Sequence, residues 1–589
     1  MNNHLQKRQN VIKGIFITVV IILASRLFYI QIINEEREFS SEVTIKQVAA
    51  RGAIYDRNGK LMVSIQASYD LTVIPNEVIE FDTLRLCELT DLSIEDFRIK
   101  LKKAKDYSKY KKSIISEQLP NKSAAQIREE LNSFKGFDTK LNIGRNYNVD
   151  VAGHIIGFLG KENEDMEGKS GIELSYEEKL KGKAGTKVML VDVLNIPRES
   201  VDNGDRDIVA IHGKNIFITL DIDLQKYSEN LMQNKIGAIV AIEPSSGEIL
   251  TLVSSPTYSP KDLIGRERSN NYTLLCNDTI NKPLFNRALN GIYPPASPLK
   301  IVNSLIALQE RSLNKNSHIA CNGGFLYGNN KILKCHKHPN LVNLKSAIYT
   351  SCNTYFCNLW ESFFDKYNSV YKGYDVWKEH VESFGFGNYL KNDFKSGQKG
   401  YIPESSHLDK KFPFKWQSST ILSMSIGQGE LNCTPIQMAN LSAIIANRGF
   451  YYIPHIIKGI ENDTIPSRFS EKQHTSIDPQ HFETIIDGMA QVLSDIDGTA
   501  FGHGVKGLSI CGKTGTAQNN HGEDHSIFIA FAPKEKPKIA IAVYIENAGW
   551  GSEWAAPIAT LIIEKYLNNT ISRPILEEKM INGNLINKE

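Results

Sequence analysis

An apolar segment near the N-terminus constrains this chain most, because it decides on which side of a membrane the rest can fold. Residues 14–24 are almost wholly aliphatic, and residues 27–33 continue the run after Ser25 and Arg26. A helix over residues 11–33 is long enough to cross about 30 Å of hydrocarbon at 1.5 Å per residue. The segment is longer than the apolar part of a signal peptide, and no small-residue cleavage site follows it. The sequence therefore predicts a single transmembrane helix.

The charges around this segment predict its orientation. Three basic residues precede it and three acidic residues follow it: Lys7, Arg8 and Lys13, then Glu35, Glu36 and Glu38. The positive-inside rule keeps the short N-terminus in the cytoplasm and exports the bulk of the chain. Arg26 is costly in lipid unless it snorkels or pairs with another helix, so it could mark a side that faces a partner.

The overall composition predicts several folded domains. The chain has 589 residues, too many for one hydrophobic core, and 41% of them are hydrophobic. Its 68 basic and 66 acidic side chains leave a formal net charge of only +2. Such a balance provides no basic field that could hold nucleic acid.

The pattern of the exported part changes near residue 215. Before it, short strand-like segments such as residues 69–74 alternate with charged helical ones such as residues 93–107, which indicates an α+β region. After it, the sequence predicts a sheet formed by both ends of a domain around a helical insert. We expect strands at 216–220, 237–242, 248–254, 526–532 and 538–546, helices at 221–233 and 555–567, and a loose polar tail from residue 568.

A Ser-x-x-Lys sequence at Ser297 and Lys300 opens an apolar helical pattern that continues over residues 301–308. Pro298 suits a first helical turn, and the i, i+3 spacing predicts that hydroxyl and amine share one face. A desolvated lysine with a lowered pKa can take the proton of a serine and make it a nucleophile. Alone, the pattern is more typical of a capped helix with a surface lysine.

Two later motifs favour the catalytic interpretation. Ser351-Cys352-Asn353 and Lys513-Thr514-Gly515-Thr516 follow in the order that penicillin-binding proteins and class A β-lactamases share. Other segments resemble the pedestal and the transpeptidase domain of class B penicillin-binding proteins: residues 51–59, 171–173 with Tyr176, 220–225, and 425–430 with Thr434 and Pro435. Ala296 replaces a usual glycine and Pro298 a frequent threonine, and neither change removes a reacting group. The chain is identified as a member of the penicillin-binding protein 2 family.

The resemblance implies an α+β multidomain protein with a membrane helix, an elongated α+β pedestal, and a transpeptidase domain whose antiparallel sheet is flanked by helices and an all-helical lobe. The expected segments are a cytoplasmic tail (1–10), the transmembrane helix (11–33), the pedestal (34–215), the transpeptidase domain (216–567) and a flexible tail (568–589). The expected location is the bacterial inner membrane, with the bulk of the chain periplasmic.

The resemblance also implies the chemistry. Ser297 attacks the penultimate D-alanine of a stem peptide, with Lys300 as base and Ser351 passing the proton to the leaving D-alanine. Asn353 holds Lys300 and the substrate amide. Lys513, Thr514, Gly515 and Thr516 bind the substrate, and the N–H groups of Ser297 and Thr516 form an oxyanion hole. A second stem peptide accepts the acyl group, and β-lactams stall at the acyl stage. No cofactor is required.

Alternatives remain at this stage. A β-lactamase or D,D-carboxypeptidase has the same motifs but lacks the large spacer, and a β-lactam sensor would need more membrane segments. A septal rather than elongation role is also possible. The elongation assignment rests on the Cys/His-rich residues 321–338, and it implies a SEDS-family glycan polymerase and scaffold proteins of the elongation complex as partners.

Four residues form a candidate structural zinc set: Cys321, Cys335, His338 and Cys352. A disulfide between Cys321 and Cys335 is an equally strong alternative for an exported domain. Free thiols are the third.

Overall fold

The computed structural model describes residues 2–29, 41–119, 121–162, 165–191, 197–265, 267–328, 330–412, 415–519 and 521–586. Residues 30–33 of the predicted membrane helix, Glu35, Glu36 and Glu38 lie outside these ranges. The chain forms two compact units, Met1–Ala50 with Gly182–His212, and Arg51–Lys181 with Gly213–Glu589.

The first unit contains the apolar helix and a small sheet. Helix α1 spans Asn2–Phe28, and its part from Arg8 to Phe28 is long and apolar enough to cross a membrane. In the sheet, β1 (Ser41–Gln47) pairs antiparallel with β8 (Gly185–Val191), which pairs with β9 (Pro197–Ser200). A single apolar helix of this kind is what the hydropathy pattern predicts.

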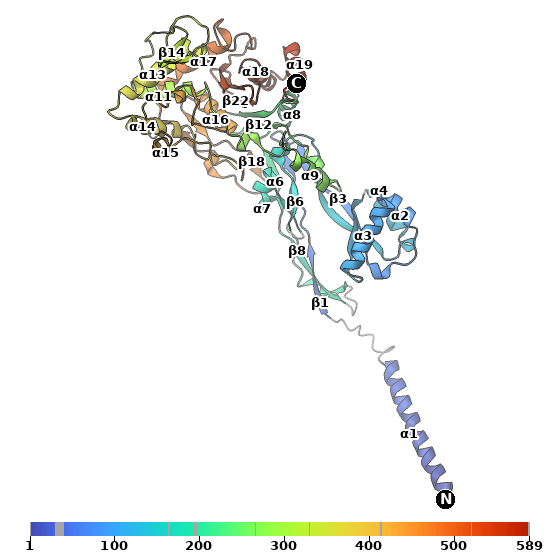
Figure 1. Ribbon diagram of the computed structural model, residues 1–589. Coiled ribbons are helices and arrows are strands. Elements are labelled where there is room, and N and C mark those ends of the chain that lie inside the picture. Colours follow the sequence, from blue (N-terminus) through green and yellow to red (C-terminus); the bar gives the residue numbers. More distant parts are fainter. Residues whose placement is uncertain are drawn as a thin grey trace. The chain divides into compact units, whose positions relative to one another are not determined.

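The pedestal part of the second unit is built on one long strand, β3 (Leu61–Val73), which pairs with β5 along its length and with β2 and β4. The other strands are β2 (Ile54–Tyr55), β4 (Ser113–Leu119), β5 (Phe137–Tyr147), β6 (Leu159–Glu162) and β7 (Asp165–Gly168). The helices are α2 (Thr83–Thr90), α3 (Ile94–Tyr107), α4 (Asn121–Glu129), α5 (Gly153–Ile156), α6 (Gly171–Ser175) and α7 (Glu177–Leu180). Figure 1 shows α2, α3 and α4 gathered beside β3. The short strand expected at residues 69–74 is thus the end of a strand of 13 residues.

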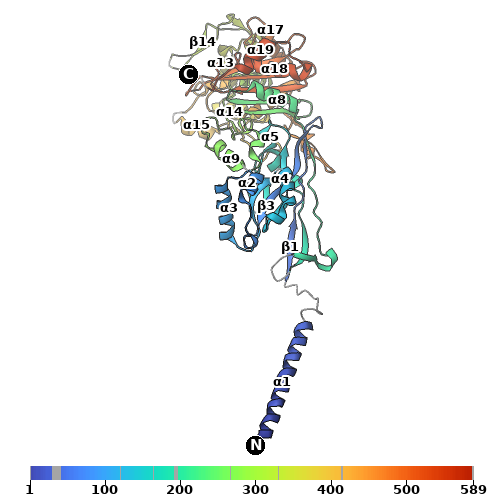
Figure 2. The same ribbon diagram turned by 90° about the vertical axis from the view of Figure 1, so that its right-hand side faces the viewer.

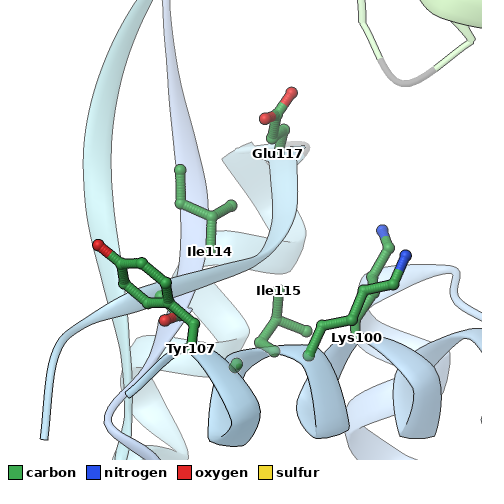
Figure 3. Close-up of a pocket in the computed structure, with 8 residues that line it drawn as sticks. Lys100, Tyr107, Ile114, Ile115 and Glu117 are labelled. Atoms are coloured by element: carbon green, nitrogen blue, oxygen red, sulfur yellow. The ribbon is translucent and has the colours of Figure 1, made fainter. Parts of the chain in front are cut away.

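Helix α3 begins where the sequence predicts, because Ser93 Oγ accepts a hydrogen bond from the Asp96 N–H at 3.0 Å. Between α3 and the edge strand β4 lies a hollow of about 400 Å³. Its wall includes Lys100, Tyr107 and Ile114 (Figure 3). None of the predicted catalytic residues lines this hollow.

The two segments that resemble a class B pedestal meet through buried charges. Arg51 Nη2 donates to Glu173 Oε2 at 2.8 Å, and Arg145 Nε donates to Glu173 Oε1 at 2.7 Å. Tyr176 Oη donates to Asp393 Oδ2 at 3.0 Å. This contact joins the pedestal to the catalytic region, the part of the second unit that follows residue 215 and holds the three motifs. Breaking such a buried pair from one side typically costs about 3–5 kcal/mol.

The catalytic region contains a five-stranded antiparallel sheet in the order β12-β11-β22-β21-β20. The strands are β11 (Gly237–Ile242), β12 (Ile249–Ser255), β20 (Cys511–Ala517), β21 (His525–Ala532) and β22 (Ile539–Ile545). Strands from opposite ends of the region pair directly, since β11 lies between β12 and β22. This arrangement confirms the prediction of a sheet that closes around a helical insert.

Successive residues of β11 point to opposite faces of this sheet, as the strand period of two requires. Val240 packs in one hydrophobic core with α11 (Leu299–Gln309) and α16 (Pro435–Ala446). Ile239 packs in another with α18 (Ala555–Asn568). Figure 1 shows α8 and α18 on one side and α11, α13 and α14 on the other.

The helices of this region are α8 (Ile222–Leu231), α9 (Arg268–Asn277), α10 (Arg287–Asn290), α11 (Leu299–Gln309), α12 (Leu344–Tyr349), α13 (Asn353–Asp365), α14 (Val370–Ser383), α15 (Ser405–Lys411), α16 (Pro435–Ala446), α17 (Phe482–Ser494), α18 (Ala555–Asn568) and α19 (Pro574–Asn582). The small strands are β10 (Ile216–Ile218), β13 (Ile319–Ala320), β14 (Gly324–Tyr327), β15 (Lys331–Lys334), β16 (Leu341–Val342), β17 (Phe450–Tyr452), β18 (Ile457–Ile460) and β19 (Lys472–His474).

The expectation of a loose tail from residue 568 is wrong for most of that segment. Helix α19 lies beside α18 (Figure 2), and its Met580 is fully buried. Lys235 Nζ donates to the Gly583 carbonyl at 2.9 Å, and Leu585 N–H donates to the Asn234 carbonyl at 2.9 Å. One apolar face within a mainly polar sequence is enough to dock a short helix. Residues 587–589 lie outside the described chain.

Candidate active site

Three separate elements bring the predicted motifs together. Ser297 lies in the turn before α11, and Lys300 lies in the first turn of that helix. Ser351 and Asn353 lie where α12 gives way to α13, and Lys513 lies on β20. Ser351 has a left-handed backbone with φ of 57°, a conformation that non-glycine residues adopt at some cost. The turn thereby aims its hydroxyl at the other two motifs.

The hydroxyl of Ser351 is the meeting point of the site. Its oxygen accepts hydrogen bonds from Lys300 Nζ at 3.1 Å and from Lys513 Nζ at 2.9 Å. The same hydroxyl donates to Ser297 Oγ at 3.2 Å. The Lys300 N–H donates to the Ser297 carbonyl at 3.1 Å, one turn earlier, whereas no hydrogen bond between Lys300 Nζ and Ser297 Oγ is found among the described residues. Ser351 therefore connects the Ser297 hydroxyl with both amines.

Lys300 is fully buried, and its remaining partners fix the position of its amine. Its Nζ donates to Asn353 Oδ1 at 2.6 Å and to the Ser351 carbonyl at 2.8 Å. Desolvation by burial lowers the pKa of Lys300 to about 8. Lys513 is also fully buried, and desolvation, followed by the charge of Lys300, lowers the pKa of Lys513 well below its usual value. Burial thus favours the neutral amine that a general base requires.

The Asn353 amide is held from both ends. Its Oδ1 accepts from Lys300, while its Nδ2 donates to the Lys334 carbonyl at 2.8 Å. This pair of contacts fixes which end of the amide faces the lysine. An amide nitrogen carries two hydrogens, so one remains for a ligand.

Strand β20 is an edge strand, and its free edge faces the catalytic groups. The Thr514 carbonyl accepts from Lys513 Nζ at 3.1 Å, and the Thr516 carbonyl accepts from Gln428 Nε2 at 3.0 Å. In an antiparallel strand the N–H and C=O of one residue point to the same side. The N–H of Thr516 therefore points away from β21, toward the same groove.

The chain before the nucleophile is tightly packed. Ala296 has a left-handed backbone with φ of 51° and its N–H donates to the Gly427 carbonyl at 2.8 Å. A Cβ on Gly427 would lie 2.0 Å from the Ala296 carbonyl oxygen, and a Cβ on Gly515 would lie 2.8 Å from Pro298 Cδ. Both glycines are required by these close approaches. The substitution of alanine for the usual glycine at 296 is tolerated, with backbone strain.

The four predicted metal-ligating residues come together beside Asn353. The Sγ atoms of Cys321, Cys335 and Cys352 and a ring nitrogen of His338 all lie within 4.8 Å of one another. The structure has all eight cysteines as free thiols, so the Cys321–Cys335 disulfide is not formed in it. Cys335 Sγ accepts the Asn353 N–H at 3.1 Å. A hydrogen bond from Cys352 is the main cause that lowers the pKa of Cys335.

Two residues at the cleft, Trp550 and Thr499, were not predicted from the sequence. The His336 ring lies 5.2 Å from the exposed ring of Trp550, edge to face. Thr499 contacts Thr514. Neither belongs to a motif, and no local pattern in the sequence indicates them.

Comparison with known proteins places this site in a family. Residues 237–564 match the profile of the penicillin binding protein transpeptidase domain, and residues 46–218 match that of the penicillin-binding protein dimerisation domain. Peptidoglycan D,D-transpeptidase MrdA of Acinetobacter baumannii is 30% identical over 97% of this chain and 89% of its own length. MrdA of Escherichia coli K12 is 30% identical over 90% of this chain and 89% of its own.

The chain belongs to the penicillin-binding protein 2 family.

Solved structures of this family support the same assignment. Penicillin-binding protein 2 of Helicobacter pylori in complex with MreC aligns with a TM-score of 0.73 and 25% identity over 89% of this chain and 99% of that one. Penicillin-binding protein 2 of Pseudomonas aeruginosa in complex with WCK 5153 aligns with a TM-score of 0.66 and 26% identity over 89% and 97%. The chain is thus a class B, elongation-type peptidoglycan D,D-transpeptidase, as the resemblance and the Cys/His-rich residues 321–338 predict.

The lowered pKa of Lys300 predicts how acylation depends on pH. A lysine that acts as a general base does so in its neutral form, so acylation by a penicillin should rise with pH and reach half its maximum near pH 8 if Lys300 has this role. At pH 7 a pKa of about 8 leaves roughly a tenth of the amine neutral, roughly 300-fold more than an ordinary lysine. The measurement is the second-order acylation rate between pH 6 and pH 10. A rate independent of pH over this range would contradict Lys300 as the base.

Proposed function

We propose that Ser297 is the nucleophile, that Lys300 is its general base, and that Ser351 passes the proton between them. The observation that supports this path is the Ser351 hydroxyl, which contacts Ser297 Oγ and both lysine amines. With Lys300 neutral, the hydrogen bonds reverse: Ser297 donates to Ser351 and Ser351 donates to Lys300. The proton then returns along the same path to the departing D-alanine.

We propose that the free edge of β20 binds the donor peptide. Lys513 and the hydroxyls of Thr514 and Thr516 would hold the terminal carboxylate, and Gly515 leaves room beside Pro298. The N–H groups of Ser297 and Thr516 would stabilise the oxyanion, a contribution of about 3–4 kcal/mol per donor in comparable enzymes. The second hydrogen of Asn353 Nδ2 would hold the substrate amide. The amine of another stem peptide then takes the acyl group, and a β-lactam stops at the acyl-enzyme.

The assignment of the nucleophile is tested by labelling with a fluorescent penicillin. Ser297→Ala should lose the covalent label completely, because the ester would form on the Ser297 hydroxyl while Ser351 only passes the proton. Ser312→Ala, beyond the far end of α11, is the matched control and should label like the parent. Label retained on Ser297→Ala refutes the assignment. An adduct that persists for minutes to hours fits a transpeptidase, whereas rapid loss would indicate a β-lactamase.

We propose that Cys321, Cys335, His338 and Cys352 bind one structural zinc ion. Three thiolates and an imidazole form a complete tetrahedral set, and Cys335 Sγ lies 3.3 Å from His338 Nε2, close to the ligand separation that zinc imposes. His338 Nδ1 lies 2.7 Å from the Pro339 carbonyl, a contact that keeps the proton on Nδ1 and leaves Nε2 free to bind metal. The ion would hold residues 321–338 against the Ser-x-Asn turn and has no open position for catalysis.

Metal analysis of protein purified without chelator tests the zinc site. We expect about one zinc per chain in the parent, and less than half of that in Cys335→Ser, since losing a ligand typically weakens binding at least tenfold. Cys276→Ser is the matched control, because Cys276 is exposed and outside the cluster. Absence of zinc together with only six titratable thiols among the eight cysteines would instead support the Cys321–Cys335 disulfide.

We propose that α1 anchors the protein in the inner membrane with residues 1–10 in the cytoplasm, residues 34–215 as the pedestal and residues 216–567 as the transpeptidase domain. The apolar length of α1 and the basic residues before it support this arrangement. A SEDS-family polymerase and elongation scaffold proteins are the proposed partners, supported by the relative solved with MreC. Cell fractionation checks the anchor: protein lacking residues 2–29 should leave the membrane fraction.

A further inference from the structure

Thr499 lies outside every motif, yet it contacts Thr514 of one motif and Tyr349, which lies two residues before another. It belongs to the loop that joins α17 to β20, fourteen residues before Lys513 in the sequence. Its side-chain oxygen lies 2.6 Å from the Thr514 side-chain oxygen, which is a short hydrogen bond between two hydroxyls. Its backbone N–H donates to the Tyr349 carbonyl at 3.0 Å.

The two contacts tie together opposite walls of the cleft. Tyr349 is the last residue of α12 and stands two residues before Ser351. Thr514 lies on β20, next to Lys513, and is itself buried. Thr499 therefore fixes the distance between the strand that would bind the substrate and the turn that carries Ser351.

A threonine hydroxyl has one hydrogen and can turn about its C–O bond. To bind a carboxylate, Thr514 must donate that hydrogen to the ligand. A hydroxyl that itself accepts a hydrogen bond is a better donor, because hydrogen bonds in a chain polarise one another.

We propose that Thr499 is a positioning residue for recognition of the substrate carboxylate. Its hydroxyl donates to Thr514 Oγ1, so that the Thr514 hydrogen points into the cleft. The inference rests on the proposed role of Thr514 and extends it to a residue that touches no substrate. The recognised group is the terminal carboxylate of a D-alanyl peptide, or the equivalent carboxylate of a β-lactam.

The test compares acylation rates of hydroxyl-deletion variants with benzylpenicillin. Thr499→Val should acylate about three- to tenfold more slowly, the loss expected for one neutral hydrogen bond. Thr499→Ser should recover the parental rate within about twofold, because it restores the same donor. Thr514→Val and the double variant should be equally slow, since both hydroxyls act through one path.

A ligand without the anion separates positioning from a general structural effect. With the methyl ester of benzylpenicillin, Thr499→Val and the parent should acylate at the same reduced rate. Thr475→Val is the matched control, because it removes a similar hydroxyl contact, to the Gly449 carbonyl, away from the cleft, and it should not change either rate. Thr499→Ala gives the same comparison if the valine variant folds poorly.

Three results would overturn the proposal: an unchanged rate in Thr499→Val, an equal loss with acid and ester, or losses that multiply in the double variant. Failure of the proposed acylation of Ser297 gives different results. In that case the parent itself does not acylate, or Ser297→Ala still does.

Discussion

The structure depends on one hydroxyl oxygen that accepts hydrogen bonds from two buried lysines. Two ammonium groups in contact with Ser351 would repel each other in a poorly solvated site, so burial and mutual repulsion both favour loss of a proton. The neutral amine that the proposed base requires is favoured by this crowding. Helix α11, the left-handed turn at Ser351 and the edge strand β20 each contribute one side of the arrangement. None of the three motifs could create it alone.

The cluster of Cys321, Cys335, His338 and Cys352 is connected to Lys300 through Asn353. Asn353 holds Lys300, and Asn353 is in turn held by the Lys334 carbonyl and by Cys335 Sγ. Lys334 and Cys335 are therefore linked to Lys300 through Asn353. A metal ion that fixes Cys335 would also fix the amide that orients Lys300, which is the general role of groups that support a reacting residue.

The sequence predicted those parts of the fold that local patterns encode. The apolar runs at residues 237–242 and 538–546, the charged helical segment at residues 93–107 and the order of the three motifs all led to correct elements. The Ser-x-x-Lys spacing places Lys300 one turn after Ser297, and the two side chains meet through the Ser351 hydroxyl. The docking of α19 was missed, since a polar sequence hides the one face that carries Met580. Thr499 was also missed, because only the fold brings residues 349, 499 and 514 together.

The ionisation of Lys300 is the most direct test of the account, and it can be measured by NMR of isotope-labelled lysine side chains. A buried lysine should titrate near pH 8, and its signal should disappear in Lys300→Ala. Lys235 also has a pKa lowered to about 8 by burial, so the measurement is made in a Lys235→Ala background. A Lys300 signal that stays protonated above pH 10 would contradict the account.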